Sequence, residues 1–238
     1  MLITKLRENI NDISIHGLPR KIEEILRKNR FLSVFNMESL EDSKETTLPF
    51  HIFKLQAEDF FATYLDKYMR GRGIPTMSTA LTKKFLQSLL EIFTNASIHS
   101  KSRPGVFVCG QLYPNKSRLD FTIADAGIGI LENVRQHTGQ KRMLSSEAIK
   151  WALKEGNSTK KDRQPGGLGL KLIKDFINLN TGKMQIISRF GYYEFSQGEF
   201  SVSDMDHDFP GTCVNIEINT QDSNSYCLQT ELNNKDIF

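Results

Sequence analysis

The stretch SLLEIFTNASIHS, from Ser88 to Ser100, has the apolar spacing of an amphipathic helix. Its apolar stripe, extended by one turn, consists of Phe85, Leu89, Phe93 and Ala96. Glu91, Asn95 and His99 follow one another at intervals of four residues, so they form a polar line beside the buried face. A helix that only packs has little use for a carboxylate, an amide and an imidazole in line. This stretch therefore predicts a site as well as a core helix.

Outward from this stretch the pattern predicts a layered fold. The full helix is expected over Ser78–Ser100, followed by strands over Gly105–Leu112 and Arg118–Asp125 with a turn at Pro114–Asn115. Further elements are expected as a short helix, a serine-capped helix over Ser145–Gly156, a helix over Leu168–Asn180, a hairpin over Gly182–Phe195 and a final buried strand over Gly211–Ile218. Strands joined by tight turns favour a two-layer α/β sandwich, with a mixed, mainly antiparallel sheet and helices on one face.

The chain divides by pattern into three parts: residues 1–75, 76–220 and a polar tail, 221–238. The first part predicts a helix over Pro19–Asn29, a strand over Leu48–Leu55 and a helix over Ala57–Met69, with a break at Arg70–Pro75. Three roles are open for it: extending the sheet, forming a homodimer or holding a protein partner.

Composition narrows the class of protein. A length of 238 residues allows one large domain, and 39% hydrophobic with 25% charged residues is ordinary for a globular protein. The net charge of +3 and the lack of a dense basic stripe argue against nucleic-acid binding. No apolar run approaches a membrane span, and three cysteines without metal-ligand spacing fit reduced thiols. We expect a cytoplasmic protein.

Two glycine clusters compete as ligand-binding loops. PGGLGLKL places Gly166, Gly167 and Gly169 at a helix start, where unpaired N–H groups suit an anion, although a tight entry turn would look the same. It matches neither the Walker A loop nor the dinucleotide fingerprint. In DAGIGI, Asp125 ends a strand and is followed by Gly127 and Gly129. The Asp125 carboxylate could accept a hydrogen bond from an exocyclic amine, or it could simply form an Asp turn.

Four short motifs therefore occur in order. They are Glu91-x-x-x-Asn95, Asp125-x-Gly127-x-Gly129, Gly166-Gly167-x-Gly169 and Gly211-Thr212. This ordered set resembles the motifs of the GHKL ATPase superfamily, which includes the histidine kinases, and the likeness covers Ser78 to about Thr220. It implies the Bergerat ATP-binding fold, with ATP and Mg²⁺ as ligands.

The resemblance also implies roles for single residues at the base and metal. Asn95 would ligate Mg²⁺ through its side-chain oxygen, and Glu91 would orient or deprotonate the group that attacks the γ-phosphoryl. His99 would contact phosphate or a residue that supports the ligand contacts, or else it would serve only the fold. Asp125 would accept the adenine amino group, and Thr212 would complete the adenine pocket.

Further roles follow for the loops around the ligand. Gly127 and Gly129 would leave room beside the base, while the turn Gly166–Gly169, which includes Leu168, would surround the phosphates. A mobile lid would run from about 137 to 165, with Lys160 and Lys161 facing the anion.

Two departures from the histidine kinases narrow the activity. Ile98 stands where those kinases carry Lys or Arg, and the lid segment Ala152–Lys161 is instead similar to that of the anti-sigma-factor serine kinases. His207-Asp208 has a phosphoacceptor dipeptide but is expected in a loop, and no dimerising phosphoacceptor domain or second ATPase domain is visible. We expect a regulatory kinase or ATPase acting on a protein partner, or else a non-catalytic ATP-gated switch.

Overall fold

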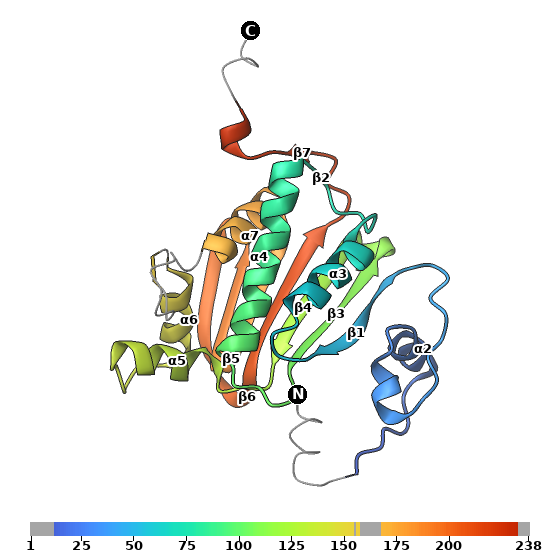
Figure 1. The fold of residues 1–238 in the computed structure, drawn as a ribbon, viewed down its shortest axis with the longest axis horizontal. Helices are drawn as coiled ribbons and strands as arrows, with labels where there is room; N and C mark the ends of the chain where they lie inside the picture. Colours follow the sequence, from blue (N-terminus) through green and yellow to red (C-terminus); the bar gives the residue numbers. More distant parts are fainter. Residues whose placement is uncertain (1–11, 155, 158–167, 233–238) are drawn as a thin grey trace.

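The computed structural model describes residues 12–154, 156–157 and 168–232, and its centre is a five-stranded sheet (Figure 1). The strands are β1 (Thr47–Phe53), β3 (Val106–Tyr113), β4 (Arg118–Asp125), β5 (Lys183–Ser196) and β6 (Glu199–Asn219). They lie in the order β1-β3-β4-β6-β5, and each neighbouring pair is antiparallel. Helices pack on this sheet, so the predicted two-layer α/β sandwich is confirmed.

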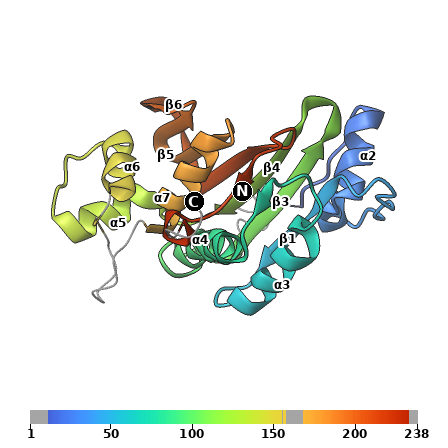
Figure 2. The same cartoon turned by 90° about the horizontal axis from the view of Figure 1, so that it is seen from above.

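Three helices cover one face of the sheet (Figures 1 and 2). They are α3 (Glu58–Met69), α4 (Thr79–Ile98) and α7 (Leu168–Leu179), with α4 packed between the other two. Ser78 caps α4, because its Oγ accepts a hydrogen bond from the Leu81 N–H at 3.1 Å. The apolar stripe predicted for α4 is buried against the sheet, as expected for an amphipathic helix: Phe85, Leu89, Phe93 and Ala96.

A second helical pair, α5 (Gly129–Thr138) and α6 (Ser145–Leu153), stands beside β5 around its own small core. The serine cap predicted for α6 is wrong, because its N-cap is Leu144. The Glu147 carboxylate instead accepts a hydrogen bond from the Leu144 N–H at 2.8 Å. The side chain of Ser146 is engaged elsewhere, on Asp204.

The hairpin predicted over Gly182–Phe195 is wrong. That segment forms the single strand β5, and the chain turns only at Gln197–Gly198 before β6 returns along its whole length. The pairing of β5 with β6 shifts in register between Arg189 and Gly191, but β5 continues through this irregularity. His207-Asp208, predicted in a loop, lies within β6.

The N-terminal region contributes to the same core as the rest of the fold. Strand β1 pairs with β3 at the edge of the sheet, so it extends the sheet, and α3 packs against it. Helix α2 (Arg20–Lys28) and the 3₁₀ turn η1 (Phe31–Phe35) lie at this edge, where the Phe50 ring contacts Phe31 and Phe107 at centroid distances of 5.3 and 6.3 Å. Residues 47–69 are thus continuous with the core expected to begin at residue 76.

The tail beyond the sheet returns to the start of α4. Strand β7 (Ser225–Tyr226) pairs in parallel with β2 (Thr76–Met77), and η3 (Gln229–Glu231) follows it. The Glu231 carboxylate accepts a hydrogen bond from the Ser78 hydroxyl at 2.6 Å. The remaining short element, η2 (Pro114–Lys116), forms the predicted turn between β3 and β4. Among the helices described, none combines the length and apolar character that a membrane crossing requires.

Candidate functional site

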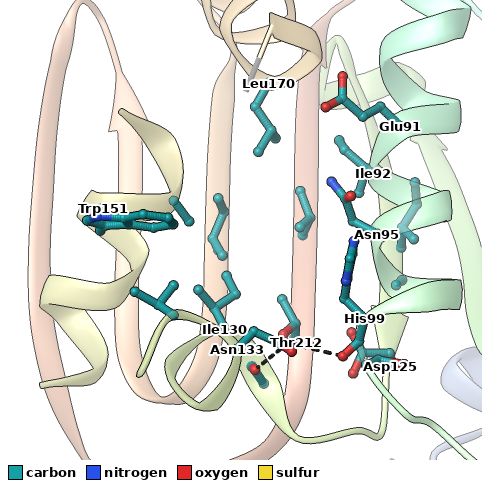
Figure 3. Close-up of a pocket in the computed structure, with 18 of the residues that line it drawn as sticks. Glu91, Ile92, Asn95, His99, Asp125, Ile130, Asn133, Trp151, Leu170 and Thr212 are labelled. Atoms are coloured by element: carbon teal, nitrogen blue, oxygen red, sulfur yellow. Dashed lines mark hydrogen bonds between the residues drawn. The ribbon is translucent and has the colours of Figure 1, made fainter. Parts of the chain in front are cut away.

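A pocket of about 160 Å³ lies between α4 and the α5–α6 pair, over strands β4, β5 and β6 (Figure 3). An apolar cavity of about 150 Å³ is large enough to take up a benzene ring, so this space can hold a flat ring system. The polar residues that line the pocket include Glu91, Asn95, His99, Asp125, Asn133 and Thr212. Residues predicted from three separate motifs therefore meet in one pocket.

One wall of the pocket is the polar line on α4. Figure 3 shows Glu91, Asn95 and His99 in succession along the helix, with their side chains on the pocket side. This arrangement follows from their spacing, because residues four apart lie on one face of a helix. Glu91 lies at the end near Leu170 and the start of α7, whereas His99 lies at the end near Asp125.

Asp125 forms the floor of the pocket together with Thr212. Asp125 is the last residue of β4 and pairs in register with Thr212 on β6. The Asp125 side chain is 3% exposed, and its Oδ1 accepts a hydrogen bond from the Gly127 N–H at 2.9 Å. Burial raises the pKa of Asp125 to about 7, although hydrogen bonds from the backbone of Gly127 and Thr212 act in the opposite direction.

Ser188, which sequence reasoning missed, holds this floor in place from β5. Its Oγ lies 3.0 Å from the Thr212 Oγ1, donates to the Gly211 carbonyl at 3.2 Å and accepts from the Ile130 N–H at 2.8 Å. Ser188 also pairs in register with Thr212. One buried hydroxyl thus ties β5, β6 and the start of α5 together. No local motif signals it, because the contact with Ile130 spans 58 residues of sequence.

The two glycines of DAGIGI serve the fold as much as the pocket. A Cβ on Gly127 would lie 1.8 Å from the Ser100 carbonyl oxygen, so only glycine fits there. Gly129 has φ +80°, and a Cβ on it would meet the Arg189 side chain at 2.6 Å. Gly129 is among the residues that line the pocket, whereas Gly127 is not. Of the two glycines expected beside a base, Gly129 is therefore the one that lies at the pocket.

Asn133, a second residue that sequence reasoning missed, joins two walls of the pocket. Its Nδ2 donates to the carbonyl oxygens of His99 and Gly129, at 3.0 and 3.1 Å. The contact fixes the end of α4 against the start of α5. In the sequence, Asn133 is simply a polar residue on an expected short helix, and it belongs to none of the four motifs.

The wall opposite α4 is apolar and comes from α5 and α6. Ile130, Val134 and Trp151 line it, and Trp151 is the only tryptophan of the chain. The Trp151 ring lies 5.5 Å from that of His137, and the Trp151 carbonyl accepts a hydrogen bond from the Asn157 side chain at 2.8 Å. An apolar wall facing a few polar groups is the usual make-up of a small-molecule pocket.

The predicted phosphate loop falls mostly outside the described residues. This applies to Gly166, Gly167 and the lid lysines Lys160 and Lys161, whereas Leu168 and Gly169 form the first residues of α7. Ile98 is 57% exposed on α4 and is not a pocket residue. The described lining of the pocket contains neither lysine nor arginine.

The described residues suit a metal only if the ligand brings most of the coordination. No three His, Cys, Asp or Glu side chains within them cluster closely enough to hold an ion. Mg²⁺ bound to a nucleotide differs, since phosphates and water supply most of its oxygen ligands and the protein adds one or two. Asn95, which faces the pocket from α4, has the oxygen required for that arrangement (Figure 3).

Comparison with known proteins does not assign the chain to a family. No protein-family model matches the chain, and a search of curated proteins found no match. Any functional conclusion therefore depends on the motifs and on their arrangement in the fold.

Proposed function

We propose that the protein is a Mg²⁺-ATP-binding ATPase of the GHKL type, acting as a regulatory kinase or ATPase on a protein partner. The observation that carries this proposal is the convergence of distant motif residues on one pocket. Asp125 and Thr212 lie side by side at its floor, while Asn95 and Glu91 line its wall. The spacing between Asp125 and Thr212 in the sequence gives no local reason for them to meet.

The floor of the pocket suits an aminopurine. The ionised Asp125 side chain accepts hydrogen bonds only, so it matches an exocyclic amine, and the Thr212 hydroxyl can donate or accept beside it. The isoleucines Ile123, Ile130 and Ile186 add apolar surface for the faces of a ring. We assign this end of the pocket to the adenine base.

The opposite end of the pocket suits the phosphates. Leu170, in the first turn of α7, lies near Glu91 at that end (Figure 3). The N-terminus of a helix carries unpaired N–H groups and a partial positive charge, both of which favour an anion. Asn95 would hold Mg²⁺, which would neutralise phosphate charge, and Glu91 would accept a proton from the attacking hydroxyl or water.

A second candidate function is an ATP-gated switch without phosphoryl transfer. The observation that favours it is the absence of lysine and arginine from the described lining of the pocket, together with the exposed Ile98 in place of a cation. Phosphoryl transfer needs positive charge on the transferring group, which here would have to come from Mg²⁺ and from residues outside the described part.

Calorimetry tests the proposal. Titration of the protein with ATP in Mg²⁺ is expected to give one site, which Asp125→Ala abolishes and Asn95→Ala weakens mainly in the presence of Mg²⁺. Thr122→Ala is the control, because Thr122 pairs with Asn215 on the other face of the sheet. Binding that is absent in the wild type, or unchanged in Asp125→Ala, contradicts the proposal. Incubation with γ-labelled ATP and a candidate partner then separates kinase from switch.

A further inference from the structure

The wall of the pocket formed by α6 is fixed at one end by the distal part of the β5–β6 hairpin, residues 189–210, which we call the β5–β6 ribbon. The Asp204 carboxylate accepts two hydrogen bonds from Ser146, one from its N–H at 3.0 Å and one from its hydroxyl at 2.6 Å. Ser146 is the second residue of α6. Asp204 therefore acts as a helix cap supplied from 58 residues away.

The other strand of the ribbon, β5, also contacts the start of α6, in this case by close packing. Gly191 on β5 pairs in register with Asp204 on β6. A Cβ on Gly191 would lie 2.7 Å from the Ile149 Cδ1 and 2.8 Å from the Ser145 carbonyl carbon. Both strands of the ribbon thus contact the first turns of α6 at one point, and the Ile149 side chain is fully buried there.

Trp151 lies at the other end of α6 and faces the pocket. Only one turn and a half separates it from Ser146, so a tilt of the helix start changes the position of the indole ring. Helix α6 is also supported by the small cluster of Val134, Met143 and Ala148, and by Ile149 and Leu153, which pack on the main core. Asp204 itself does not line the pocket.

We propose that Asp204 is a positioning residue for the ligand: by holding Ser146 it sets the place of the Trp151 wall, and this wall packs against the bound nucleotide. The negative charge of Asp204 also suits its place at a helix N-terminus. The inference relies on the proposed function for the identity of the ligand, but the link from Asp204 to Trp151 stands without it.

The fluorescence of Trp151 tests both steps, because it is the only tryptophan in the chain. Without nucleotide, Asp204→Ala is expected to shift the emission to longer wavelength and to increase quenching by acrylamide. With ATP and Mg²⁺, the same variant is expected to bind about fivefold more weakly, because the ~1 kcal/mol that a helix cap usually contributes to ordering the helix start would then come out of the binding energy. Asp206→Ala, the same charge change two residues along β6, is the control and is expected to behave as the wild type.

Two further variants keep the test decisive if Asp204→Ala folds poorly. Asp204→Asn retains one acceptor oxygen and should restore part of the wild-type signal. Ser146→Ala removes one of the two bonds, and its effect should not add to that of Asp204→Ala. Identical Trp151 quenching and ATP affinity in the Asp204 and Asp206 variants would overturn the inference. A wild type that binds no ATP would contradict the proposed function, and the quenching comparison would still decide the inference.

Discussion

The two halves of the helix-covered sheet face differ in how they are filled. Under α3 and the adjoining side of α4, rings pack against one another: Phe61 lies 4.3 Å from Phe93 and contacts Phe53 and Phe121 at 5.6 and 6.5 Å. On the other side of α4 the same sheet meets a pocket lined by aliphatic chains, polar groups and the Trp151 ring. One helix separates a solid core from a ligand-sized space. The difference shows that the α3 flank of α4 is filled with packed rings, whereas the opposite flank combines packing against α7 with a ligand-sized pocket.

The largest expected effect comes from truncation in the filled half. Phe61→Ala should lower the free energy of unfolding by about 3–5 kcal/mol, because a fully buried ring is lost from a closed aromatic cluster. Ile92→Ala, on the pocket side of α4, should cost less than the usual ~2–5 kcal/mol, since water can enter the enlarged pocket. Urea unfolding of both variants measures the contrast, and equal losses would contradict it.

The buried carboxyl of the pocket half should give stability an unusual pH dependence. Asp125 has its pKa raised from 3.8 to about 7 in the folded state, so the folded protein binds the proton more tightly than the unfolded chain. The contribution of the protonated Asp125 carboxyl to the free energy of unfolding is therefore fully present below pH 4. It is lost as the pH rises towards 7, with a slope of at most about 1.4 kcal/mol per pH unit for one group.

Asp125→Asn should remove that slope and raise stability at pH 8, as measured by urea unfolding across this range. Asp120, on the other face of the sheet, also has a pKa raised mainly by burial. Asp120→Asn is therefore the matched control: it should remove its own part of the slope and leave ATP affinity unchanged. A wild-type slope that survives Asp125→Asn intact would argue against a buried, proton-binding carboxyl at the pocket floor.

Substitution of glycine in the pocket loop should have a smaller effect. Gly127→Ala forces a Cβ onto the Ser100 carbonyl, so the loop must shift, and overpacking relieved in this way costs about 1–3 kcal/mol. ATP affinity should fall with it, because the same loop holds Asp125. Gly139→Ala is a suitable comparison, since Gly139 has φ +74° but open space around it, so the penalty should be about 1–2 kcal/mol without loss of binding. If thermal unfolding and calorimetry do not separate the two variants, the Ser100 contact is unimportant.

Sequence reasoning found the parts of the site that local patterns encode. The spacing of Glu91, Asn95 and His99 places them on one helix face, and the DAGIGI pattern marks Asp125 as the end of a strand before a glycine turn. Ser188 and Asn133 were missed because they act through contacts between elements distant in sequence. Their residue types occur in any strand or helix, so only the fold shows what they hold.

The errors in the predicted fold have a common cause. The stretch Gly182–Phe195 suggested a hairpin, yet it forms one strand, and its internal Gly191 is required by the close approach of α6 from outside the strand. Likewise, Ser145 and Ser146 suggested a local helix cap, but the hydroxyl of Ser146 bonds to Asp204 on β6. In both cases a tertiary contact uses a residue whose local pattern has a simpler meaning. The sheet order was also beyond the sequence, because β6 lies between β4 and β5.

A structure of the protein with Mg²⁺ and a non-hydrolysable ATP analogue tests the central claim most directly. The account predicts the adenine amino group on the Asp125 carboxylate, the base beside Thr212 and the phosphates towards Asn95 and the start of α7. An analogue bound elsewhere on the surface, or a pocket that stays free of it at saturating concentration, would contradict the account.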